Sequence, residues 1–167
     1  MVDGPTATAL VGREREFGLL ADAVAEAAGG SAVLVRIEGD PGTGKSRLAT
    51  DCLTLAKQAG FAVTACRGEE QSATIPFGAA THAVGRLLRA ARPEARHRLV
   101  DGLTQLSLLL PGLGLPAGAT LSDPGLQRLA LHSALTQLLD RVSRGQPLLW
   151  VVDDADRLDS ASVELLH

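Results

Sequence analysis

The residues best suited to chemistry lie in a glycine-rich stretch at 39–46, which reads GDPGTGKS. It matches the pattern G-x-x-x-x-G-K-[ST], in which glycines let the backbone approach a ligand and turn its N–H groups toward an anion. Lys45 can place a compact positive charge on the β- and γ-phosphates of a nucleotide, and the Ser46 hydroxyl can ligate Mg²⁺. The stretch therefore predicts a phosphate-binding loop.

A second candidate feature is the acidic pair Asp153–Asp154, which follows the apolar run LLWVV at 148–152. An apolar strand that ends in acid places carboxylates at the carboxyl edge of a parallel sheet, where ligands bind in open α/β folds. Asp153 is the natural partner of Mg²⁺, directly or through water, because this cation prefers oxygen ligands. Asp154 could orient or activate an attacking water. Such a pair taken alone is usually an ordinary loop or helix cap, and the loop at 39–46 is what favours the metal interpretation.

The elements around the loop have the order that a phosphate site needs. The run AVLVRIE at 32–38 predicts a buried strand, and apolar residues at helical spacing predict a helix over 45–59 that ends at Gly60. The run FAVTAC at 61–66 predicts a second strand. Strand, turn, helix and strand form a βαβ unit, which implies a parallel sheet. The helix following the loop adds its positive N-terminal end to the phosphate site.

The remaining elements predict a helical insertion between the second strand and a third one. Helices are expected over 13–28, 75–91 with Pro76 in its first turn, 94–110 and 126–143, a connection over 111–125, a strand over 147–152, and a helix from 160. The expected fold is α/β, with a three-layer P-loop core, a parallel sheet and this insertion. Residues 1–9 are expected to be a flexible N-terminus and 10–167 a single P-loop domain.

Composition narrows the function classes. The chain of 167 residues is 46% hydrophobic and carries a net charge of −3, which argues against a nucleic-acid-binding surface. No signal peptide or 18-residue apolar run is present, so neither secretion nor a membrane partner is expected. Two cysteines without metal-ligand spacing favour a reduced cytoplasmic protein. Lys45 and Lys57 are the only lysines, so a lysine at position 45 points to a need for an ammonium group.

Several segments resemble one family. Residues 39–46 and 148–154 resemble the Walker A and Walker B elements of P-loop ATPases, and LVGREREFGLL at 10–20 resembles the opening of AAA-like ATPase domains of the STAND class. The segments at 67–88 and 147–166 are similar to the parts of that branch after its second strand and at its Walker B helix. The likeness extends to the N-terminal ATPase domain of large LuxR-type transcriptional regulators.

The resemblance implies ATP and Mg²⁺ as ligands. It places Val11, Gly12 and Arg13 near the adenine and ribose, although Arg13 also fits a solvated first helical turn. Asp153 would hold the metal, and Asp154 stands where many of these ATPases have a catalytic Glu, which puts efficient hydrolysis in doubt. The chain would be the front part of such a module, lacking the sensor strand and C-terminal subdomain. Without that strand, the sheet is expected to have a gap or an altered pairing.

The candidate residues fall into three groups. Asp154 and Lys45 are the candidate catalytic residues, and Ser46 and Asp153 the candidate metal ligands. The candidate nucleotide-binding residues are Gly39, Asp40, Pro41, Gly42, Thr43, Gly44, Lys45, Ser46 and Arg47, with Val11, Gly12 and Arg13. Four arginines could include a γ-phosphate sensor or a finger for a neighbour, but nothing selects one: Arg128, Arg141, Arg144 and Arg157.

Three functions stay open at this point. The chain could be an enzyme that hydrolyses ATP, a regulatory switch that binds ATP or ADP with little turnover, or an incomplete domain that binds nucleotide poorly. Asp at position 154 and the expected missing C-terminal half favour the switch or the incomplete domain over the competent enzyme. Self-association on ATP binding is left open.

Overall fold

The computed structural model describes residues 12–70 and 74–166, which form two compact units. The first unit is Met1–Ala59 and the second is Gly60–His167. The flexible N-terminus expected over residues 1–9 and the assignment of Val11 to the nucleotide site lie outside the described residues. Each unit is therefore best understood from its own packing.

The first unit contains two helices in contact with each other, α1 (Glu14–Ala28) and α2 (Lys45–Gln58). Helix α1 buries Leu20 and Val24, four residues apart, on one face. It ends at Gly29–Gly30, as predicted, and Gly30 has a φ of 97°. Helix α2 buries three residues at four-residue spacing, Leu48, Cys52 and Ala56. It ends just before Gly60, whose φ of 85° is the left-handed conformation expected of a helix stop.

The predicted strand at 32–38 is wrong for this structure. The segment is not part of a sheet, and Leu34 is 90% exposed rather than buried. A β-strand needs a neighbour to satisfy its backbone N–H and C=O groups, and the described residues of the first unit include no second strand. Sequence propensity alone therefore did not make this run a strand.

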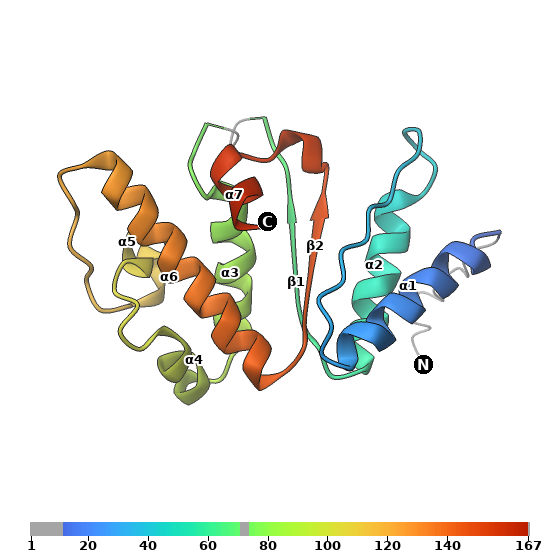
Figure 1. The fold of residues 1–167 in the computed structure, drawn as a ribbon, viewed down its shortest axis with the longest axis horizontal. Coiled ribbons are helices and arrows are strands. Elements are labelled where there is room, and N and C mark those ends of the chain that lie inside the picture. The colour runs from blue at the N-terminus through green and yellow to red at the C-terminus, as the bar shows by residue number, and fades with distance from the viewer. Residues whose placement is uncertain (1–11, 71–73, 167) are drawn as a thin grey trace, which may run out of the picture. The chain divides into compact units, whose positions relative to one another are not determined.

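The second unit is built on a parallel pair, β1 (Ala62–Arg67) and β2 (Leu148–Asp153). The two strands are in register from Ala62 opposite Leu148 to Arg67 opposite Asp153. Helix α3 (Gly78–Ala90) packs against β1, and α6 (Pro124–Gly145) lies beyond α3 (Figure 1). The parallel sheet and the insertion between these two strands are confirmed. The parallel neighbour of β1 is β2.

The insertion differs from the prediction in two places. Helix α3 begins at Gly78, so Pro76 precedes it rather than lying in its first turn, because Phe77 takes the N-cap position with a φ of 62°. The single helix expected over 94–110 is two helices, α4 (Pro93–Val100) and α5 (Leu106–Leu109). Gly102 separates them with a φ of 72°, a left-handed conformation that ends a helix.

The other elements of the unit follow the predicted order. They are a 3₁₀ turn at Pro111–Leu113, a 3₁₀ turn at Ala155–Arg157 and α7 (Ser160–Leu165). Helix α6 begins two residues before its predicted start, with Pro124 in its first turn and the Asp123 side chain accepting a hydrogen bond from the N–H of Leu126 at 2.9 Å.

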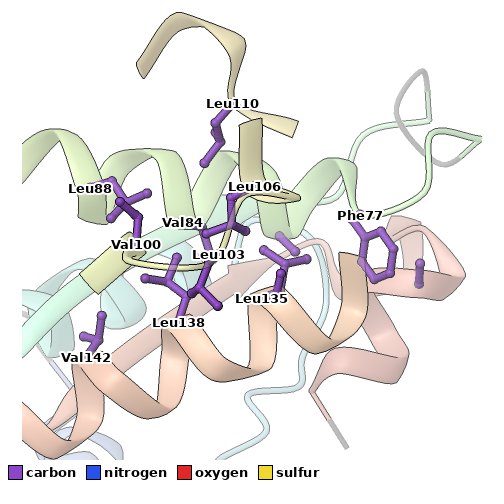
Figure 2. Packing of buried hydrophobic residues seen from close by; sticks show 13 residues of the cluster. Phe77, Val84, Leu88, Val100, Leu103, Leu106, Leu110, Leu135, Leu138 and Val142 are labelled. Carbon is purple, nitrogen blue, oxygen red and sulfur yellow. The ribbon is translucent and has the colours of Figure 1, made fainter. Parts of the chain in front are cut away.

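The core of the second unit lies between α3, α6 and the α4–α5 region. Side chains from these elements meet around Leu106 and Leu138, both fully buried (Figure 2). Phe77 closes the cluster at the start of α3 and is also fully buried. The cluster packs against Ala62, Leu148 and Trp150 of the sheet. Nearer the carboxyl ends of the strands, a smaller cluster joins Cys66 to Ala79 and Ala83 of α3.

Candidate functional site

The glycine-rich loop at 39–46 makes a tight turn before α2. Gly44 is the N-cap of α2 with a φ of 88°, a conformation that L side chains rarely adopt. A Cβ at Gly39 would lie 3.0 Å from Oγ1 of Thr43, so this position also favours glycine. The loop leads directly into the first turn of α2, whose N-terminal N–H groups favour anions.

Lys45 is held against the loop that it follows. Its Nζ donates hydrogen bonds to the carbonyl oxygens of Gly39 at 2.8 Å and Asp40 at 2.9 Å. Thr43 stabilises the same turn, since its N–H and its Oγ1–H donate to the carbonyl oxygen of Asp40 at 3.3 and 2.8 Å. The ammonium group thus lies where a loop wrapped around a phosphate would present it.

The residues after Lys45 continue the first turns of α2. The carbonyl of Ser46 accepts a hydrogen bond from Thr50 Oγ1 at 2.8 Å. The Arg47 Nε contacts both carboxylate oxygens of Asp51 at 3.1 Å, one turn further along the helix. Arg47 therefore makes a contact along the helix, while Ser46 lies in the helix's first turn beside the loop.

Arg13 connects the start of α1 to the loop. One guanidinium nitrogen donates to Oε1 of Glu16 at 2.6 Å, and the other donates to the carbonyl of Thr43 at 3.0 Å. The pKa of Glu16 is lowered by a hydrogen bond from its own backbone N–H and by the hydrogen bond from Arg13. Gly12 is anchored next to them, because its N–H donates to Oε1 of Glu14 at 3.2 Å.

A cavity of about 250 Å³ opens beside the loop within the first unit. Its apolar wall comes from both helices and the segment at 35–38, and includes Leu20, Ile37 and Leu48. Its polar rim includes Arg13 and Lys45. The structure thus brings the loop, the start of α1 and an apolar cavity together in one unit.

The second unit brings the acidic pair to the carboxyl end of its sheet. Asp153 is the last residue of β2, and its carbonyl accepts a hydrogen bond from the N–H of Gly68 at 2.9 Å. Asp154 follows with a φ of 49°, and its N–H contacts Oδ1 of Asp153 at 3.2 Å. The turn is close-packed, since a Cβ at Gly68 would lie 2.2 Å from the carbonyl oxygen of Asp154.

The carboxylate of Asp154 is paired with Arg67. Arg67 ends β1, and its Nε lies 2.7 Å from Oδ2 of Asp154. The hydrogen bond and charge of Asp154 raise the pKa of Arg67 above its ordinary value, so this guanidinium stays charged. Asp154 is therefore occupied by an ion pair rather than presented alone to a water molecule.

Comparison with known families shows which family the chain belongs to. Residues 9–167 match the family described as AAA ATPase domain. The chain belongs to the AAA ATPase domain family. No curated protein and no solved structure matches it. Membership makes the chain an AAA-like P-loop ATPase domain and supports nucleotide binding as its activity.

Arg67 contacts the acidic pair of this AAA ATPase domain, and sequence reasoning did not single it out. The predicted second strand ended at residue 66, one residue before it. The signal that could have found it is the parallel pairing, because the ends of two parallel strands meet at one edge of the sheet. Arg67 lies opposite Asp153 in that register.

Each of the four candidate arginines of the AAA ATPase domain has a partner within the second unit. Arg141 donates to the backbone carbonyls of Leu99 and Asp101. The other three arginines form ion pairs with acidic side chains. The ion pairs are Arg128 with Glu164, Arg157 with Glu70 and Arg144 with Asp140. Their contacts are those of structural surface arginines.

The other singled-out residues have structural roles. Both cysteines are free and buried, and burial raises the pKa of the Cys52 and Cys66 thiols. The Trp150 indole N–H donates to Cys66 Sγ at 3.2 Å, so both side chains belong to the packing of the sheet. Across residues 12–70 and 74–166, no group of three metal-binding side chains is gathered, and no helix is long and apolar enough to cross a membrane.

Proposed function

We propose that this AAA ATPase domain binds ATP with Mg²⁺ through residues 39–46. The main support for this proposal is the position of Lys45. Its ammonium group donates hydrogen bonds to the carbonyls of Gly39 and Asp40 beside the N-terminus of α2. A cation, a left-handed glycine turn and a helix N-terminus all favour the same anionic ligand. The proposal assigns residues 39–47 to nucleotide binding, with Lys45 on the β- and γ-phosphates.

We place the adenine and ribose at the start of α1. The cavity beside the loop supports this placement, because it combines apolar walls from Leu20 and Leu48 with a polar rim that includes Arg13. Gly12 and Val11 would complete the approach, as the resemblance to STAND-class domains implies. ATP is preferred over GTP on that same resemblance.

The metal part of the proposal assigns Mg²⁺ to Ser46 and Asp153. Mg²⁺ favours octahedral oxygen coordination with several waters, and a hydroxyl with one carboxylate fits that donor set. The three-layer core expected from the sequence is part of this proposal, with 10–167 acting as one domain.

We expect weak ATP hydrolysis by this chain alone. The Asp154 carboxylate already holds one partner, since Arg67 Nε lies 2.7 Å from its Oδ2. Phosphoryl transfer depends on positioned charge, and one missing arginine finger can cost about 10³- to 10⁵-fold in rate. These features favour a nucleotide-dependent switch, in the role of the ATPase domain of a LuxR-type transcriptional regulator in the cytoplasm.

The metal assignment is tested by titrating the chain with ATP in the presence and absence of Mg²⁺. Asp153→Asn should leave binding without Mg²⁺ nearly intact and reduce the gain in affinity that Mg²⁺ provides, because a neutral amide is a weaker ligand for a hard cation. Asp156→Asn is the matched control, since Asp156 is an exposed acid three residues further on. An unchanged Mg²⁺ gain in Asp153→Asn would refute the assignment.

The turnover prediction is tested by phosphate release at saturating ATP. We expect a rate well below about 1 s⁻¹, the lower range of ordinary enzymes. Lys45→Ala serves as the control for contaminating ATPases. A rate above that value, abolished in Lys45→Ala, would show that the chain is a competent enzyme.

A further inference from the structure

A buried carboxylate, Asp159, joins two helix N-termini in the second unit. Only 3% of its surface is exposed, and it is the N-cap of α7. Oδ1 accepts hydrogen bonds from the N–H groups of Ser162 and Phe77, both at 2.8 Å. Oδ2 accepts from Ser162 Oγ at 2.7 Å and from the N–H of Ala79 at 3.3 Å. One side chain thus caps α7 and α3 together.

The second helix start held by Asp159 is a strained one. Phe77 has a φ of 62°, a left-handed conformation that is costly for a bulky residue, and its side chain is fully buried. Phe77 N–H donates directly to Asp159, and Ser162 Oγ accepts from Ala80 N–H at 3.1 Å. Asp159 and Ser162 therefore supply the contacts that keep the α3 start in this conformation.

The turn that carries the acidic pair lies between two such attachment points. At its beginning, Asp153 and Asp154 contact Gly68 and Arg67 at the end of β1. At its end, Asp159 contacts the start of α3. Only the five residues 154–158 separate β2 from this second attachment, and Asp154 is itself left-handed at φ 49°. A shift of Asp159 would reach Asp153 through a short, close-packed chain.

We propose that Asp159 is a positioning residue for the metal-binding acid: by bridging the starts of α3 and α7 it fixes the turn that orients Asp153 and Asp154. This inference rests on the proposed assignment of Asp153 to Mg²⁺. A displacement of Phe77 is expected to disturb the acidic turn as well, because its N–H donates to Asp159.

The substitution that tests this is Asp159→Asn. In either orientation the amide NH₂ would face N–H or O–H donors, so at least one of the four hydrogen bonds is lost while side-chain volume is kept. We expect the Mg²⁺-dependent gain in ATP affinity of the full chain to fall by at least about threefold, with ATP affinity in the absence of Mg²⁺ changed by less than about twofold. If Asp159 were only structural, the substitution would lower the melting temperature and leave the Mg²⁺-dependent gain in ATP affinity of the folded molecules unchanged.

Asp123→Asn is the matched control, because Asp123 is the N-cap of α6 and accepts a single exposed hydrogen bond from Leu126. Its Mg²⁺ gain should equal that of the unsubstituted chain. If Asp159→Asn does not fold, Ser162→Ala tests the inference instead. A Mg²⁺-dependent gain in ATP affinity that falls by about twofold supports the inference, and an unchanged gain overturns it.

The positioning role of Asp159 and the assignment of Asp153 to Mg²⁺ can be tested separately. If Asp153→Asn loses the Mg²⁺ gain and Asp159→Asn keeps it, the inference about Asp159 is wrong and the metal assignment stands. If the unsubstituted chain shows no Mg²⁺ gain, the metal assignment is wrong and the positioning role falls with it.

Discussion

The two units hold their functional residues in different ways. In the first, Lys45 is fixed by carbonyls five and six residues away, and Leu34 in the segment before the loop is 90% exposed. In the second, Arg67 reaches Asp154 across 87 positions and Phe77 reaches Asp159 across 82. The loop at 39–46 is therefore held mainly by local contacts, whereas the acidic turn depends on a sheet and a buried core.

The largest difference in the free energy of unfolding is expected when one leucine in each unit is replaced by alanine. Leu135→Ala removes a fully buried side chain from the core of the second unit and should lower the free energy of unfolding by about 2–5 kcal/mol. Leu34→Ala should change it by less than about 0.5 kcal/mol, since that side chain is mostly in solvent. Denaturant unfolding followed by circular dichroism, with Trp150 fluorescence reporting on the second unit, measures both. Equal effects would remove the contrast between the units.

A smaller effect is expected at the acidic turn itself. A Cβ at Gly68 would lie 2.2 Å from the Asp154 carbonyl oxygen, so Gly68→Ala must displace the turn and should cost about 1–3 kcal/mol of unfolding free energy. Gly112→Ala is the control, because nothing lies within 4 Å of its Cβ position. Unfolding followed by Trp150 fluorescence gives both values. A Gly68→Ala chain as stable as the control would mean that the turn is not close-packed.

Sequence reasoning succeeded where structure depends on nearby residues. The helices at 14–28 and 45–58, the strand at 148–153 and the glycine stops at Gly30 and Gly60 follow from local periodicity and from the freedom of glycine at positive φ. The loop at 39–46 belongs to the same group, because its pattern specifies its own turn.

Sequence reasoning failed where the structure depends on contacts between residues far apart in the chain. The run at 32–38 has strand propensity but no partner strand within its unit, and Gly102 divides a stretch that looks helical by spacing. The contacts of Arg67 and Asp159 could not be predicted, since Arg67 reaches Asp154 across 87 positions and Phe77 reaches Asp159 across 82. Their roles required the strand register and the packing of α3 against α7.

The central claim is that the loop at 39–46 binds ATP through Lys45, and one matched pair of variants tests it. Lys45→Ala removes the charge assigned to the β- and γ-phosphates and should weaken ATP binding by at least tenfold, about 1.4 kcal/mol. Lys57→Ala removes the chain's other lysine, in the last turn of α2, and should leave the affinity unchanged. Titration calorimetry with ATP and Mg²⁺ on both variants is the measurement. Equal affinities for Lys45→Ala, Lys57→Ala and the unsubstituted chain would contradict the account.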